Sequence, residues 1–282
     1  MRVLLVGDTH GNQRWLQGTV FPTAAREDVD LIVQIGDFGW WPGNAGGDAF
    51  LEAARRSVVP VWWIDGNHEH HDQLAALVEA SGQLGSDDLV SGVELGGNLT
   101  YLPRGARFTL DGVTVAVCGG AHSIDRQLRN PGRSWFEAER ISDADVARCA
   151  AGGAADILIS HDAPAGWNIP NIISDGDLPP RLAAELASCA SHRAQLARIF
   201  HAVTPALVVH GHYHSAYTTV IDTPWGSVDV VGLGCDGTAG NVALLNCDAG
   251  EWSVTSLRVP AQQRDLASGG SRGFRGGHEA RN

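Results

Sequence analysis

Short apolar runs alternate with helical patterns through the first two thirds of the chain, and this order constrains the fold more than any other feature. The runs are rich in β-branched residues and end in polar clusters; they occupy residues 3–10, 30–37, 59–69, 113–122, 156–162 and 206–214. Helical spacing of apolar residues occurs between them, at residues 47–57, 70–81, 142–151 and 180–202. Strands that alternate with helices predict βαβ units with parallel pairing, and therefore an α/β protein.

The C-terminal third has a different pattern. Residues 216–234, 241–248 and 251–259 predict antiparallel strands separated by turns, which we expect to complete the same domain. One domain is therefore expected over residues 1–260. Residues 261–282 are rich in Gly and Arg and lack apolar periodicity, so they cannot bury enough surface to offset the entropy of ordering and are predicted to form a flexible tail.

Composition excludes several functional classes. The 282 residues carry a net charge of -12, which argues against a general nucleic-acid binder or a binder of anionic membranes. All 20 basic residues are Arg, so Schiff-base chemistry and a Walker A lysine are ruled out. The five cysteines are scattered, with no C-x-x-C pair, which indicates reduced packing residues. The N-terminal apolar run is too short for a signal peptide and no run is long enough to span a membrane, so a cytoplasmic location is expected.

Polar side chains gather where the predicted strands end, and they are of one chemical kind. In open α/β sheets, functional residues cluster outside the carboxyl ends of the strands. Carboxylate, amide and imidazole groups without cysteine suit Mn²⁺, Fe or Zn²⁺. One stretch alone, "VVHGHYH" at 208–214, favours a strand whose histidines face water, but the ordered set favours a metal site. The residues are Asp8, His10, Asp37, Asn67, His68, His161, His212 and His214.

The motifs D-x-H, G-D, G-N-H-E, a lone H and G-H-x-H, in this order, resemble those of the calcineurin-like metallophosphoesterase family over residues 3–215. The resemblance implies an α/β fold in which two mixed β-sheets pack as a sandwich flanked by helices. It also implies two divalent transition-metal ions, with Mn²⁺ expected in vitro and Fe or Zn²⁺ as alternatives. By the same resemblance one ion is bound by Asp8, His10 and His214, the other by Asn67, His161 and His212, and Asp37 bridges both.

The resemblance further implies that a hydroxide held between the two ions attacks a phosphate ester in line. His68 has no ligand role in the family pattern and is the candidate for protonating the leaving alkoxide. Glu69 replaces the more frequent Asp of the motif, and either orients His68 or supports the loop. Asp162 is a candidate for fixing an imidazole tautomer.

Substrate contacts are less clearly marked in the sequence. Residues 119–142 fit a phosphate-binding rim, because Arg binds phosphate, and they fit a solvated loop equally well. One of the aromatic side chains at 38–41 is expected in the core and another at the floor of the substrate pocket. His210 is expected to be buried and hydrogen-bonded, and His70 and His71 are expected on the surface. The residues selected as substrate contacts are His122, Arg126 and Arg129.

A phosphodiesterase acting on small nucleotides, cyclic or linear, is the leading functional hypothesis. It rests on the resemblance and on the lack of a large appended recognition domain. A phosphomonoesterase, including a Ser/Thr protein phosphatase, uses the same metal core and is the enzymatic alternative. An interaction scaffold of the same fold is the non-enzymatic alternative. The expected partner is a small phosphoester, and the oligomeric state is left open.

Overall fold

The computed structural model describes residues 1–82, 92–170, 172 and 180–259, so the predicted tail at 261–282 lies outside the described residues. The larger sheet consists of β1 (Arg2–Val6), β2 (Leu31–Ile35), β3 (Val61–Ile64), β4 (Val93–Glu94), β5 (Leu99–Tyr101), β12 (Val242–Asp248) and β13 (Glu251–Ser256). The smaller sheet consists of β6 (Arg107–Leu110), β7 (Val113–Cys118), β8 (Ile157–Ser160), β9 (Leu207–His210), β10 (Tyr217–Thr223) and β11 (Gly226–Gly232). The helices are α1 (Gln13–Trp15), α2 (Phe21–Arg26), α3 (Ala45–Arg55), α4 (His71–Ser81), α5 (Asp143–Ala151) and α6 (Pro180–Val203), with a π-helical turn η1 (Leu16–Val20) and 3₁₀ turns η3 (Arg126–Leu128) and η4 (Glu137–Glu139).

Both sheets have a parallel centre and antiparallel margins. The larger has the order β13-β12-β1-β2-β3-β5-β4 and the smaller the order β10-β11-β9-β8-β7-β6. Strands β1, β2, β3 and β5 pair in parallel, as do β7, β8, β9 and β11. The predicted sandwich of two mixed sheets flanked by helices is confirmed. The strands after residue 215 form the expected antiparallel pairs β10–β11 and β12–β13, but β11 also pairs in parallel with β9.

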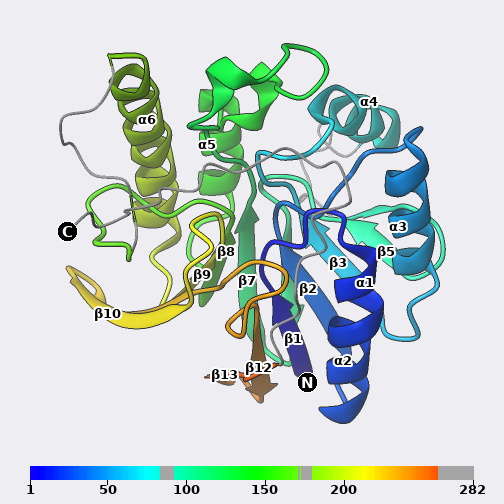
Figure 1. Ribbon diagram of the computed structural model, residues 1–282. Coiled ribbons are helices and arrows are strands. Elements are labelled where there is room, and N and C mark those ends of the chain that lie inside the picture. The colour runs from blue at the N-terminus through cyan, green and yellow to red at the C-terminus, as the bar shows by residue number, and fades with distance from the viewer. Residues whose placement is uncertain (83–91, 171, 173–179, 260–282) are drawn as a thin grey trace, which may run out of the picture.

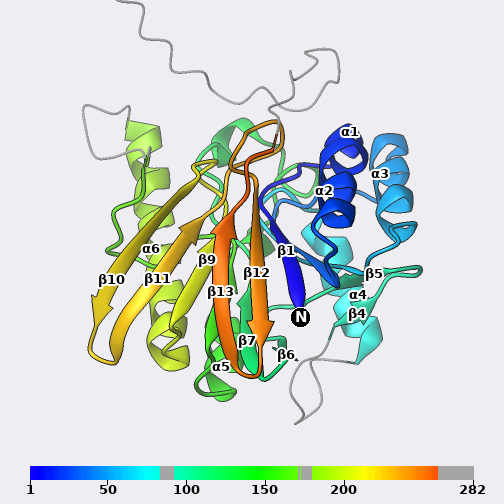
Figure 2. The same cartoon turned by 90° about the horizontal axis from the view of Figure 1, so that it is seen from below.

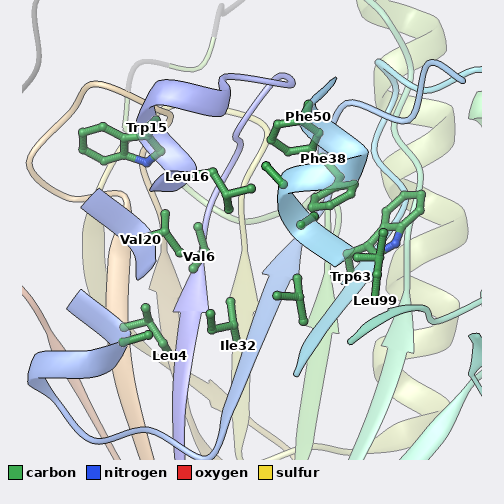
Figure 3. Close-up of a cluster of buried hydrophobic side chains, with 14 of the residues drawn as sticks. Leu4, Val6, Trp15, Leu16, Val20, Ile32, Phe38, Phe50, Trp63 and Leu99 are labelled. Atoms are coloured by element: carbon green, nitrogen blue, oxygen red, sulfur yellow. The ribbon is translucent and has the colours of Figure 1, made fainter. Parts of the chain in front are cut away.

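Three apolar layers hold the sheets and helices together. Side chains such as Leu5, Val33 and Ile159 form the layer between the two sheets. Helices α1 to α4 cover the outer face of the larger sheet, and α5 and α6 cover the outer face of the smaller one (Figures 1 and 2). In the layer under α1 to α4, Phe38 stacks on Trp63 with ring centroids 4.6 Å apart (Figure 3). Because both faces of most strands in the parallel centres are buried, these strands are mainly apolar, and polar groups gather at their carboxyl ends.

The helical segment from Gln13 to Arg26 has no counterpart in the sequence prediction. Gly18 and Pro22 interrupt its helical spacing, and the chain passes through a π-helical turn between α1 and α2. Trp15 and Val20 are fully buried, so packing on the sheet stabilises the segment despite its weak propensity (Figure 3). By contrast the predicted helix at 142–151 corresponds to α5, which begins with a capping box between Ser142 and Asp145.

Within the described part of the chain, none of the helices combines the length and the apolar character needed to cross a bilayer.

A buried ion pair connects the end of β3 to the segment before α5. Arg104 donates to Asp65 Oδ2 from Nε at 2.9 Å and from Nη2 at 2.6 Å, and Tyr101 donates to Asp65 Oδ1 at 2.9 Å. The same guanidinium group donates to the carbonyls of Ala138, Glu139 and Arg140 and to Asp145. Burial disfavours the charge on Arg104, but Asp65 and Asp145 raise its pKa above the usual value. Arg104 therefore fixes the main chain of residues 138–140 against the carboxyl end of the larger sheet.

We predict that Arg104→Met lowers the free energy of unfolding by about 3–5 kcal/mol, because Asp65 is then left as a buried charge that Tyr101 alone still contacts. Urea denaturation of the purified variant measures the loss. Arg198→Met is the matched control, since Arg198 pairs with Asp143 on the surface, and its effect should stay within about 0.5 kcal/mol. Equal effects of the two substitutions would contradict a structural role for the buried pair.

Candidate metal centre

The polar strand ends predicted from the sequence meet at one edge of the sandwich. Asp8 and His10 follow β1, Asp37 follows β2 and Asn67 follows β3, all from the larger sheet. The smaller sheet contributes residues that follow β8 and β9: His161, His212 and His214. Parallel strands bring these positions together, because their carboxyl ends lie at the same edge (Figure 1).

One group consists of Asp8, His10, Asp37 and His214, which offer ligand atoms that all lie within 4.8 Å of one another. Asp8 Oδ2 lies 3.1 Å from His214 Nε2, and Asp37 Oδ2 lies 3.4 Å from His10 Nε2. Two carboxylates and two imidazoles are a donor set that suits a divalent transition metal.

A second group lies on the other side of Asp37. His161 Nε2 is 3.4 Å from Asp37 Oδ1 and 3.3 Å from the amide oxygen of Asn67. The rings of His161 and His212 are in contact, with centroids 5.2 Å apart. Asp37 thus presents Oδ2 to the first group and Oδ1 to the second. The structure thus groups Asp8, His10, Asp37 and His214, and it places His161 beside Asp37, Asn67 and His212; metal binding by these residues in two sets stays a prediction.

The main chain at the site adopts an unusual conformation. Four of the predicted ligands have left-handed φ angles, namely His10 at 48°, Asp37 at 51°, His212 at 66° and His214 at 52°. Residues with a Cβ atom rarely adopt this conformation, which costs on the order of 1 kcal/mol or more at each position. The tightly packed strand ends impose it, and each affected side chain is turned toward the shared centre.

Glycines beside the ligands provide room for them. A Cβ atom at Gly36 would lie 2.2 Å from His161 Nδ1, one at Gly66 would lie 2.2 Å from Asp37 Oδ1, and one at Gly211 would lie 2.3 Å from Asp8 Oδ1. At Gly211 the requirement is for space and not for a left-handed main chain. The left-handed residues of that stretch are histidines, and Gly211 is needed because Asp8 occupies the space of its side chain.

Two of the imidazoles have hydrogen bonds that fix which nitrogen faces the site. His10 Nδ1 lies 3.1 Å from Asp236 Oδ1, and His161 Nδ1 lies 2.9 Å from the Ile35 carbonyl oxygen. A proton on each Nδ1 leaves the lone pair of each Nε2 free for an ion. Sequence reasoning missed Asp236, although its position after β11 in the stretch "GLGCDG" follows the same strand-end rule.

The side-chain amide of Asn67 is also oriented by a hydrogen bond to a residue outside the ligand groups. Its amide nitrogen donates to Ser123 Oγ at 3.0 Å, and Ser123 donates to Glu139 through both its hydroxyl group and its main-chain N–H, each at 2.7 Å. Burial raises the pKa of Glu139 to about 7, against the two hydrogen bonds from Ser123, which lower it. The amide oxygen of Asn67 is left to face His161. Neither Ser123 nor Glu139 lies in a recognisable motif, so the sequence offered no means of finding them.

The electrostatics of the site favour bound positive charge. Burial alone would lower the pKa of His161, but Asp37 and Asp8 raise it to about 10. Burial likewise works against the charge of Asp37, yet His68, His161 and His10 hold its pKa well below the usual range. Asp8 Oδ2 is buried and has no partner with hydrogen-bond geometry among the described residues. Carboxylates that stabilise protons on the neighbouring imidazoles would likewise stabilise divalent cations in place of those protons.

His68 lies beside Asp37 and contacts a predicted substrate residue. Its Nε2 is 3.9 Å from Asp37 Oδ2 and accepts a hydrogen bond from Arg129 Nη2 at 2.7 Å. Burial lowers the pKa of His68 to about 4; Asp37 opposes this effect, and Arg129 adds to it. The ring is therefore neutral near pH 7. Arg129 also pairs with Asp125 at 2.8 Å.

Two carboxylates next to the motifs support the site without facing it. Glu69 accepts from the main-chain N–H groups of Gly39 at 3.2 Å and Gly66 at 2.7 Å, so it supports the loop and does not orient His68. Burial and the charge of Asp37 raise the pKa of Glu69 to about 8. Asp162 accepts from Tyr213 and lies 2.8 Å from Nδ1 of His192, so the imidazole that it contacts belongs to no predicted ligand.

The other predicted substrate residues lie away from the ligands. His122 is buried, with Nε2 2.7 Å from Glu185 Oε2 on α6. Arg126 is partly exposed, pairs with the same glutamate and lies over the ring of Trp135. Of the predicted contacts, Arg129 alone is shown touching a site residue, and substrate binding by all three stays a prediction.

The remaining expectations for aromatic residues have mixed outcomes. Phe38 and Trp40 are core residues, whereas Trp41 is partly exposed and its indole N–H donates to the His68 carbonyl oxygen at 2.8 Å. His210 is fully buried and bonded to Tyr217, as expected. The surface position expected for His71 is wrong, because His71 is buried at the start of α4 next to Phe136.

Two solved structures are similar to this chain. The structure of TT1561 from Thermus thermophilus matches with a TM-score of 0.54 and 14% identity over 91% of this chain and 99% of that one. Phosphopantetheinyl hydrolase (PptH) from Mycobacterium tuberculosis matches with a TM-score of 0.39 and 14% identity over 83% of this chain and 90% of that one. At 14% identity the likeness to TT1561 shows the fold alone. A search of curated proteins found no match.

The family comparison covers most of the chain. Residues 1–216 match the family described as calcineurin-like phosphoesterase, a span that includes every predicted ligand. The match and the cluster of Asp8, His10, Asp37 and His214 together support metal-dependent hydrolysis of phosphoesters. The chain therefore belongs to the calcineurin-like phosphoesterase family.

Proposed function

We propose that this protein is a dinuclear metal-dependent phosphodiesterase that hydrolyses small nucleotide diesters, cyclic or linear. The observation that carries the proposal is the shared carboxylate: Asp37 faces one ligand group with Oδ2 and the other with Oδ1. The two ligand groups that share Asp37 would hold two divalent ions, and such a pair would supply charge neutralisation at the phosphate oxygens and a lowered pKa of water. Imidazole-rich ligand groups favour Mn²⁺, Fe or Zn²⁺ over Mg²⁺.

The charge beside the site supports a diester over a monoester. A phosphate monoester carries about two negative charges at neutral pH, whereas a diester carries one. Arg129, the cation that contacts His68, is already paired with Asp125, and its side chain is 8% exposed. It therefore adds little net positive charge for a dianion.

A partly exposed aromatic residue supports a nucleotide as the substrate. The Trp41 indole is anchored to the His68 carbonyl oxygen, so its ring lies close to the proposed leaving group. Aromatic rings of this kind stack on bases with little dependence on sequence.

We propose that His68 protonates the leaving oxygen after Arg129 has moved to the substrate. In the free protein Arg129 donates to His68 Nε2, which leaves no proton on that nitrogen. An anionic phosphate attracts the guanidinium group, and Nε2 is then free to take up a proton and pass it to the departing alkoxide. One N–H donor of Arg129 thereby moves from His68 to the ester, while Asp125 still balances most of the guanidinium charge.

Hydrolysis of bis-nitrophenyl phosphate and nitrophenyl phosphate by the metal-loaded protein compares the two ester classes directly. We expect kcat/KM to be higher for the diester, Mn²⁺ to support more activity than Mg²⁺, and EDTA to abolish it. A preference for the monoester would favour the phosphatase alternative. If neither ester is hydrolysed and the protein binds fewer than one ion per chain, an interaction scaffold would be favoured. Cyclic and linear nucleotides assayed with Mn²⁺ then identify the substrate.

Asp37→Ala is predicted to abolish hydrolysis and to reduce metal content at both positions, because it removes the one side chain that faces both groups. Elemental analysis measures the bound metal. Asp28→Ala is the matched control, since Asp28 has a similar left-handed φ of 49° on the exposed surface and should keep both ions. Two retained ions in Asp37→Ala would contradict the bridging assignment.

His68→Ala is predicted to lower kcat by roughly 10²–10⁴ for an ester with a poor alkoxide leaving group, the usual range for general acid catalysis. The deficit should shrink for nitrophenolate, which needs little protonation, while metal content stays at the wild-type level. Steady-state kinetics on the two esters separate the cases, with His201→Ala on the exposed face of α6 as the control. Equal losses on both esters would show that His68 positions the substrate and does not protonate it.

A further inference from the structure

In each of the two ligand groups, one ligand is hydrogen-bonded to an acidic residue outside the group, either directly or through a serine. In the first group the ligand is His10, and the residue behind it is Asp236. Asp236 Oδ1 lies 3.1 Å from His10 Nδ1, and Oδ2 accepts from Asn12 Nδ2 at 2.7 Å. The main-chain N–H of Asp236 also donates to the Asp8 carbonyl oxygen at 2.7 Å. Both carboxylate oxygens are therefore engaged, and the carboxylate is fixed against the β1 end.

In the second group the ligand is Asn67, and the residue behind it is Glu139, which acts through Ser123. The Asn67 amide N–H₂ donates to the Ser123 hydroxyl, and that hydroxyl donates to Glu139 Oε2. The Ser123 main-chain N–H donates to the second oxygen, Oε1. Glu139 is fully buried. Each hydrogen bond in the series is donated toward Glu139, from Asn67 to Ser123 and from Ser123 to Glu139. An amide whose nitrogen is committed in this way can present only its oxygen to a metal.

The hydrogen-bond partners of His10 and of Asn67 belong to different parts of the fold. Asp236 lies in the loop between β11 and β12, whereas Ser123 follows β7 and Glu139 belongs to η4. The hydrogen bonds of Asp236 cited above and those of the Ser123–Glu139 pair share no residue. Outer-sphere partners of metal ligands commonly change metal affinity by about 10- to 100-fold when they are removed.

We propose that Asp236 and the Ser123–Glu139 pair are positioning residues that set the affinities of the two metal positions independently. Asp236 acts on the position bound by His10, and Ser123–Glu139 acts on the position bound by Asn67. This inference rests on the proposed dinuclear function and adds to it a separate control of each ion.

The test titrates metal-free protein with Mn²⁺ alone, without substrate, and follows binding by calorimetry. Ser123→Ala should weaken one of the two binding steps about 10- to 100-fold and leave the other unchanged, and Asp236→Ala should weaken the opposite step by a similar factor. Anomalous diffraction from crystals grown at limiting Mn²⁺ identifies the position that is lost. Electron paramagnetic resonance gives a second readout, since a coupled Mn²⁺ pair should be replaced by an isolated ion in either variant.

Conservative variants separate positioning from a general loss of structure. Ser123→Thr keeps the hydroxyl group and should restore binding, whereas Glu139→Gln keeps the shape but removes one acceptor and should weaken the same step as Ser123→Ala. Thermal melting of each metal-free variant verifies folding. Ser227→Ala and Asp229→Ala, both exposed on β11, are matched controls and should bind two ions as the wild type does.

The outcomes distinguish this inference from the proposed function. Equal weakening of both steps by either variant, or no weakening by either, would overturn the inference. A wild type that binds a single ion would overturn it together with the dinuclear proposal. A wild type that binds two ions but hydrolyses neither ester would overturn the proposed function alone, and the variants would still decide between independent and joint control.

Discussion

A single buried carboxylate organises the site. Asp37 Oδ1 accepts from the main-chain N–H groups of Asn67 and His68, at 2.9 and 2.8 Å, and the same carboxylate lies within 3.4 Å of His10 and His161. An ionised group that is 1% exposed is stable only when its surroundings return the energy lost on leaving water. The two N–H donors and the imidazoles of His68, His161 and His10 supply that energy. The surroundings of Asp37 therefore favour positive charge beside its carboxylate.

The position of Asp37 depends in turn on the main chain around it. Its left-handed φ turns the carboxylate away from the path of β2, and Gly66 leaves the space that its Oδ1 occupies. Glu69 joins the Gly39 and Gly66 turns on either side through two hydrogen bonds. The longer side chain at this position, compared with the Asp usual in the family motif, is thus used to span two loops. Strain at the ligands is tolerated because apolar layers on both faces of the sheets leave the strand ends little freedom to relax.

The sequence predicts those parts of the site that arise from local order along the chain. Apolar runs that end in Asp, Asn or His locate the strand ends, and parallel pairing then brings the ligands together, as found for Asp8, Asp37 and His161. The outer partners could not be predicted in this way. Ser123 and Glu139 reach Asn67 only through a hydrogen-bonded chain that closes in three dimensions. The buried position of His71 depends on Phe136, which is distant in sequence, and the helical segment around Gly18 and Pro22 forms because tertiary packing overrides weak propensity.

The segment that connects β7 to α5 contacts both the buried Arg104–Asp65 pair and residues of the candidate site. Its main chain at 138–140 is fixed by Arg104, whose charge is balanced by Asp65 directly after β3. The same segment provides Ser123 and Glu139 behind Asn67, and Arg129 beside His68. A Cβ atom at Gly119 would lie 2.2 Å from Asp65 Oδ1, so the segment leaves β7 in direct contact with the ion pair. The buried pair therefore aligns the segment after β7 of the smaller sheet with Asn67 and His68 at the end of β3 in the larger one.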